Sequence, residues 1–138
     1  MKEQNGRRVG VLVADDAAVI RKAVLSFLKS VPNIKVLGVA ENFAQTLEMA
    51  VALKPDVVVL DLHMPDGHAI APAVVKSKLQ LCGSQVLAIS FSSGENDDEE
   101  ARALAERFGA VAYLDKARFS DELIPAILQF GGFACKPV

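Results

Sequence analysis

The sequence has 138 residues, which is enough for one domain with a buried core and too few for two ordinary domains. Apolar residues make up 51% of the chain and charged residues 23%, a balance that is typical of a globular protein and excludes a disordered one. The net charge is −2 and no basic stripe follows a helix, which argues against direct binding of nucleic acid.

The chain also lacks sequence signals for a membrane or for export. Its apolar runs are far shorter than the roughly 20 residues that a membrane helix needs, and the start MKEQNGRR has no apolar stretch of a secretory signal. We therefore expect a cytoplasmic protein without membrane insertion. Cys82 and Cys135 form no CxxC pair, and we interpret them as reduced thiols.

Strand-like and helical segments alternate along the chain. In order, the sequence predicts a strand at 8–14, a helix at 17–29, a strand at 34–40, a helix at 42–53, a strand at 57–60, a helix at 72–80, a strand at 85–90, a helix that is closed by Gly109, a strand at 110–114 and a helix at about 121–130. Because proline is poorly tolerated deep in a helix, we expect Pro125 in the first turn or so of the last one.

This order predicts an α/β fold with a parallel sheet. Several strands are apolar on both faces, as expected when helices cover both sides of the sheet. Right-handed crossovers bring the carboxyl ends of such strands to one edge, where sites in these sheets lie. The polar residues expected at that edge are Asp15, Asp16, Asp61, Ser90 and Lys116.

These side chains are suited to magnesium and phosphoryl chemistry. Three clustered carboxylates raise one another's pKa unless a cation joins them, and their hard oxygen atoms suit Mg²⁺. Together with the metal, Lys116 and the Ser90 hydroxyl would neutralise phosphoryl oxygens, and a carboxylate would serve as the nucleophile. Each acid taken alone is more simply a solvated turn residue or helix cap.

Four segments resemble the receiver domain of two-component response regulators, over about residues 7–130. VLVADDAAVIRKAV resembles the acidic strand and first helix, PDVVVLDLHMP the phosphoacceptor strand, LAIS the segment with the switch hydroxyl, and GAVAYLDK the segment with the switch aromatic and lysine. The resemblance implies a flavodoxin-like (βα)5 fold with strand order 2-1-3-4-5. It also implies an N-terminal extension at 1–6 and a C-terminal tail at 131–138.

The resemblance implies a role for each residue at the edge. Asp61 is then the phosphoacceptor, and Mg²⁺, for which Mn²⁺ is expected to substitute, binds Asp15, Asp16, Asp61 and the backbone carbonyl of His63. The phosphoryl oxygens are held by Ser90 and Lys116. The ring of Tyr113 turns inward when Ser90 moves toward the phosphate.

The resemblance also implies partners. The phosphoryl group comes from a sensor histidine kinase or a phosphotransfer protein, and a downstream protein binds the face made by the fourth helix, the fifth strand and the fifth helix. A homodimer is a further expected assembly. Nothing after Phe130 is long enough for an output domain, so we expect a signalling module that acts alone or belongs to a larger regulator.

Three positions depart from the family pattern. Phe91 follows the switch serine where a small residue is usual, and the ring either shades the site or packs in the core. Ala117 replaces a proline that often supports a cis bond. Because a cis bond without proline costs roughly 2.5–4 kcal/mol, we predict a trans Lys116–Ala117 peptide. Ala69 occupies a position where the family usually has glycine, and in this sequence a glycine comes two residues earlier, at Gly67.

Other functions fit the residues less well. An aspartyl-nucleophile phosphatase generally carries a second acid two residues after the nucleophile, and here that residue is His63. No GxGxxG follows the first strand, which excludes a dinucleotide site. His63 and His68 are a weak pair for a transition metal, and we expect His63 to modulate access at the mouth of the site. An interaction module that is never phosphorylated remains an alternative because of Phe91.

Overall fold

The computed structural model describes residues 8–90 and 95–132. The elements are β1 (Val9–Ala14), α2 (Ala18–Lys29), β2 (Ile34–Ala40), α3 (Phe43–Leu53), β3 (Val57–Asp61), α4 (Pro72–Leu81), β4 (Gln85–Ser90), α5 (Glu95–Arg107), β5 (Ala110–Asp115), the short 3₁₀ helix η1 (Lys116–Arg118) and α6 (Phe119–Phe130). Apart from η1, which was not predicted, their types and order are those predicted from the sequence. Within the described ranges, no helix has the length and apolar character needed to cross a membrane.

The five strands form one parallel sheet in the order β2-β1-β3-β4-β5, which confirms the predicted fold. The register places Ala14 of β1 beside Leu60 of β3. It also pairs Asp61 with Ile89, and Ser90 with Asp115. The carboxyl ends of the four strands β1, β3, β4 and β5 therefore meet at one edge of the sheet.

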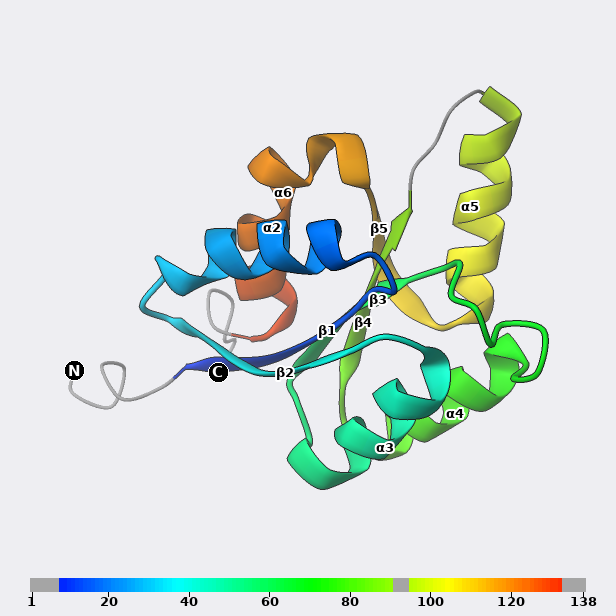
Figure 1. Ribbon diagram of the computed structural model, residues 1–138, viewed down its shortest axis with the longest axis horizontal. Coiled ribbons are helices and arrows are strands. Elements are labelled where there is room, and N and C mark those ends of the chain that lie inside the picture. Colours follow the sequence, from blue (N-terminus) through cyan, green and yellow to red (C-terminus); the bar gives the residue numbers. More distant parts are fainter. Residues whose placement is uncertain (1–7, 91–94, 133–138) are drawn as a thin grey trace.

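Helices cover both faces of this sheet, with α2 and α6 on one side and α3 and α4 on the other, where α5 also packs (Figure 1). The central strand β3 is buried along its whole length because each face has its own apolar cluster. One cluster contains Phe43, Leu79 and Phe108, and the rings of Phe43 and Phe108 stack at 5.2 Å. The other contains Leu28, Leu123 and Ile127. These two clusters hold the strand ends in place.

The start of α3 is capped twice. The Asn42 side chain accepts a hydrogen bond from the Gln45 backbone N–H at 2.8 Å, which is an ordinary N-terminal cap. The carboxylate of Asp66 accepts further hydrogen bonds from the backbone N–H groups of Phe43 and Ala44, at 2.8 and 3.0 Å. Asp66 therefore connects the loop that follows β3 to the start of α3, the helix that precedes β3 in the chain.

The prediction for Pro125 is wrong. Helix α6 begins at Phe119, directly after η1, so that Pro125 is inside the helix and beyond its first turn. Proline has no N–H to donate to the carbonyl one turn earlier, which ordinarily costs about 3 kcal/mol. The helix persists because Leu123 and Ile127, which flank the proline, are fully buried against the sheet.

Candidate functional site

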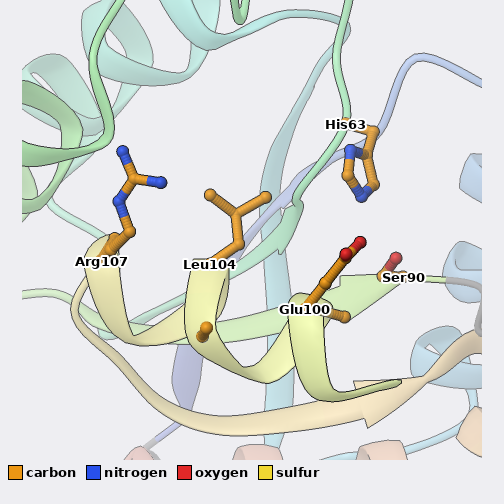
Figure 2. Close-up of a pocket in the computed structure, with 7 residues that line it drawn as sticks. His63, Ser90, Glu100, Leu104 and Arg107 are labelled. Carbon is orange, nitrogen blue, oxygen red and sulfur yellow. The ribbon is translucent and has the colours of Figure 1, made fainter. Parts of the chain in front are cut away.

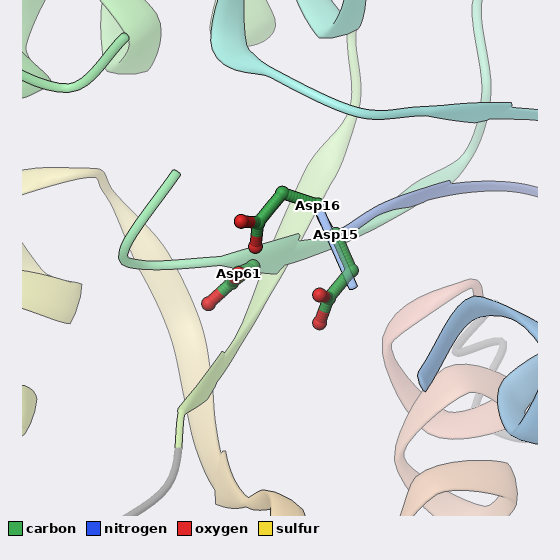
Figure 3. Close-up of side chains that lie close together, drawn as sticks. All are labelled: Asp15, Asp16 and Asp61. Atoms are coloured by element: carbon green, nitrogen blue, oxygen red, sulfur yellow. The ribbon is translucent and has the colours of Figure 1, made fainter. Parts of the chain in front are cut away.

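Three carboxylates converge at the edge where β1 and β3 end (Figure 3). Asp61 is the last residue of β3, and Asp15 and Asp16 directly follow β1. One carboxylate oxygen of each lies within 4.8 Å of the others. Asp15 and Asp61 are buried, while Asp16 is exposed. The sequence prediction that these acids meet at one edge is therefore correct.

Lys116 brings a positive charge into this cluster. Its ammonium nitrogen lies 2.7 Å from an oxygen of Asp15 and 3.4 Å from an oxygen of Asp61. The lysine is itself buried, since η1 begins directly after β5 and turns the side chain toward the end of β3. In the described part of the chain all peptide bonds are trans, which confirms the predicted trans bond between Lys116 and Ala117.

The surroundings of Asp61 raise its pKa from 3.8 to about 7. Burial is the largest cause because a charged carboxylate loses its hydration there, and the negative charge of Asp15 and a hydrogen bond with Asp16 act in the same direction. The charge of Lys116 and the backbone N–H of His63 lower the pKa but do not cancel the rise. The positive charge of Lys116 therefore does not neutralise the carboxylates of this cluster.

Asp15 is held by contacts on several sides. Its Oδ1 accepts a hydrogen bond from the backbone N–H of Ala17 at 2.9 Å, a side-chain turn that leads into α2. Its backbone carbonyl accepts a hydrogen bond from the Arg21 guanidinium at 2.8 Å. Arg21 also lies 3.6 Å from Glu41, at the end of β2. These contacts fix the carboxylate that faces Lys116.

A pocket of about 560 Å³ opens beside this cluster, between the loop after β3 and helix α5. Its lining includes the predicted residues Ser90 and His63 (Figure 2). The exposed His63 ring points toward Glu100 of α5, while Leu104 and Arg107 lie farther along the same helix. The pocket thus gives a route from solvent to Ser90, which is itself buried.

Two further predicted residues, Tyr113 and Phe91, remain to be located. Tyr113 is half-buried on β5, beside Ala88 of β4, and its ring is covered by the guanidinium of Arg102. The distance from the Arg102 Cζ atom to the ring centroid is 5.3 Å. Phe91 lies outside the described residues.

The arrangement fits a divalent cation with oxygen ligands. Among the described residues, three carboxylates face the ammonium of Lys116, and this leaves an excess of negative charge that the raised pKa of Asp61 reflects. Hard carboxylate oxygens with one exposed member, Asp16, leave room for water ligands, as Mg²⁺ prefers. A buried carboxylate beside a cation site and a lysine can act as a nucleophile toward phosphorus.

A family model for the response regulator receiver domain matches residues 11–128. The chain therefore belongs to the receiver domains of two-component signalling, a family of signalling domains. The solved receiver domain of CheB from Thermotoga maritima is similar, with a TM-score of 0.76 and 27% identity over 95% of this chain and all of that one. A structure of CheY6 with the P1 domain of CheA3 from R. sphaeroides matches with a TM-score of 0.71 and 26% identity, covering 91% of this chain and 98% of that one.

Curated relatives extend far beyond the matched segment. A protein-glutamate methylesterase/protein-glutamine glutaminase of Pseudomonas putida is 38% identical over 108 residues, which are 78% of this chain and 28% of the relative. A protein of the same name from Geobacillus kaustophilus is 32% identical over 134 residues, with 89% of this chain and 37% of the relative covered. The chain thus spans only about a third of these proteins.

Sequence reasoning missed several residues that shape the site. Arg21 supports Asp15, and Asp66 fixes the loop after β3. The hydrogen bond between Asp15 and Ala17 could have been predicted from the sequence, because an Asp side chain often accepts a hydrogen bond from the backbone N–H two residues later in the chain. For Asp66 the chain gave no such signal, since its partners lie 22 and 23 residues earlier.

Proposed function

We propose that the receiver, residues 7–130, accepts a phosphoryl group on Asp61 in a Mg²⁺-dependent reaction. The observation that supports this most strongly is the buried Asp61 carboxylate, which lies beside two further acids and a lysine at the carboxyl edge of the sheet. We further propose that the phosphoryl donor is a phosphohistidine of a sensor kinase or phosphotransfer protein. Similarity to a receiver solved with the P1 domain of CheA3 supports a donor of this kind.

Transfer forms one bond and breaks another. An oxygen of ionised Asp61 attacks phosphorus, the bond from phosphorus to the donor nitrogen breaks, and that nitrogen keeps the electron pair. Lys116, now paired mainly with Asp15, would bind a phosphoryl oxygen, and the Ser90 hydroxyl would donate to another. Asp15, Asp16, Asp61 and the His63 carbonyl would hold the metal, which supplies positive charge to the phosphoryl oxygens and favours ionised Asp61.

Labelling of the protein tests the assignment of Asp61. Wild type is treated with acetyl phosphate and Mg²⁺, and an increase in mass by one phosphoryl group is measured on the intact chain. Asp61→Asn should abolish labelling, because an amide is a poor nucleophile, while Asp121→Asn in the first turn of α6 serves as the matched control. Undiminished labelling of Asp61→Asn would contradict the proposal.

We propose that the signal leaves through the face formed by α5, β5 and α6, with Ser90 and Tyr113 as the moving parts. Tyr113 is the only tyrosine in the sequence, and tryptophan is absent, so the tyrosine fluorescence of the protein reports on this residue alone. Phosphorylation should shift that fluorescence in wild type. Ser90→Ala should still be labelled but should lose the shift, and an identical response in both proteins would show that Ser90 does not couple to Tyr113.

A further inference from the structure

Arg102 of α5 and Tyr113 of β5 make a contact that the phosphoryl chemistry does not require. The Arg102 guanidinium lies over the tyrosine ring, with 5.3 Å between Cζ and the ring centroid. At this distance the cation is attracted by the negative face of the ring. Arg102 is exposed, while its neighbour Ala101 is buried against the sheet, so the arginine extends from the rim of the helix.

The ring lies between the sheet and the guanidinium. Tyr113 belongs to the edge strand β5 and packs against the apolar cluster on the side of α5. Its hydroxyl oxygen is buried even though the residue as a whole is only half-buried. The hydroxyl end of the ring therefore points into the protein, and the Arg102 guanidinium covers part of the ring that remains exposed.

We propose that Arg102 is a positioning residue that holds the ring of Tyr113 inward. The role as a switch rests on the proposed function, in which the inward ring accompanies the phosphorylated state. A cation–π contact at an exposed site corresponds to a roughly two- to fivefold preference for the arrangement that makes it. Arg102 thus biases the domain toward the phosphorylated arrangement before any phosphoryl group is bound.

Acrylamide quenching of tyrosine fluorescence tests the contact without phosphorylation. Because Tyr113 is the only tyrosine and tryptophan is absent, all of this signal comes from one ring. Arg102→Gln should raise quenching in the metal-free protein, as the exposed share of the ring grows by about two- to fivefold. Quenching in Arg102→Lys should lie between that of wild type and that of Arg102→Gln, since lysine keeps the charge but lacks the planar guanidinium. Lys78→Gln, which removes an exposed charge from α4, is the control.

Titration with beryllofluoride and Mg²⁺ tests the switch. Arg102→Gln should weaken apparent beryllofluoride binding by about two- to fivefold, and should have no effect in a Tyr113→Leu background, where the ring is missing. Unchanged quenching, or an undiminished effect of Arg102→Gln in that background, would overturn the positioning role. Absence of any beryllofluoride binding to wild type would instead refute the proposed function, and the quenching measurement would still decide the contact.

Discussion

Lys116 lies closer to Asp15 than to Asp61, at 2.7 Å against 3.4 Å between the ammonium nitrogen and the nearest carboxylate oxygen. The lysine is thus paired chiefly with an acid that we assign to the metal, and only secondarily with the proposed phosphoacceptor. A cation bound by the acids would compensate Asp15 in place of the lysine. Lys116 would then be available to a phosphoryl group on Asp61 without any large movement of the backbone.

Removal of this lysine is expected to destabilise the fold. Lys116→Gln leaves the buried charge of Asp15 without its partner, and loss of one member of a buried pair typically costs about 3–5 kcal/mol. Urea denaturation measures the free energy of unfolding, and Mg²⁺ should restore part of the loss. Arg118→Gln breaks an exposed pair with Glu122 and should cost less than about 1 kcal/mol. Equal stability of Lys116→Gln and wild type would show that the pair contributes nothing.

Stability without metal should depend on pH through Asp61. Its pKa is 3.8 in the unfolded chain and about 7 in the folded one, so between these values the folded state binds more protons. The free energy of unfolding contributed by Asp61 therefore falls as pH rises through this window. Asp61→Asn lacks this contribution and should be more stable than wild type at about pH 8, by roughly 1–3 kcal/mol. Denaturation at about pH 5 and pH 8 tests this, and parallel pH dependence of the two proteins would refute it.

The two adjacent acids should differ when each is replaced by asparagine. Asp16→Asn affects an exposed side chain, so it should weaken Mg²⁺ binding while changing stability by less than about 0.5 kcal/mol. Asp15→Asn should lower metal affinity and also disturb the pairing with Lys116. Calorimetric titration with Mg²⁺ and urea denaturation measure the two effects. Full Mg²⁺ affinity in Asp16→Asn would exclude this residue as a ligand.

Asp66 is expected to stabilise the domain from outside the acid cluster. Asp66→Ala removes the acceptor of two backbone N–H groups at the start of α3, and losing such a cap costs about 0.5–2 kcal/mol. Thermal unfolding measures this loss, with Asp121→Ala in α6 as a control for the removal of an acid near a helix start. A melting temperature equal to that of wild type would mean that water replaces the carboxylate without cost.

The strands were predictable because their signals are local. A run such as Val57–Leu60 is apolar on both faces and has to be a buried strand, and each such strand is followed by an amphipathic helix. The strand order came from the resemblance to a family rather than from any pattern. Pro125 was misplaced because the start of α6 depends on η1, a turn with no distinct signature in the residues that form it.

The meeting of the acids with Lys116 was also predictable, since parallel strands end at a common edge. Contacts between distant side chains were not. The placement of Arg102 over Tyr113 depends on the rotation of α5 about its axis and on its position along β5. Neither quantity is encoded in the spacing of apolar residues, which fixes only the face that a helix buries.

The two caps of α3 have different consequences for the order of folding. Asn42 bonds to Gln45, three residues away, and this contact can form as soon as the helix nucleates. Asp66 lies 23 residues from Phe43, and the intervening chain includes all of α3 and β3. Closing that loop carries an entropic cost that is recovered only when β3 has joined the sheet. We therefore expect the Asn42 cap to form early in folding. The Asp66 contacts should form only when β3 joins the sheet, the step that also places Asp61 at the end of that strand.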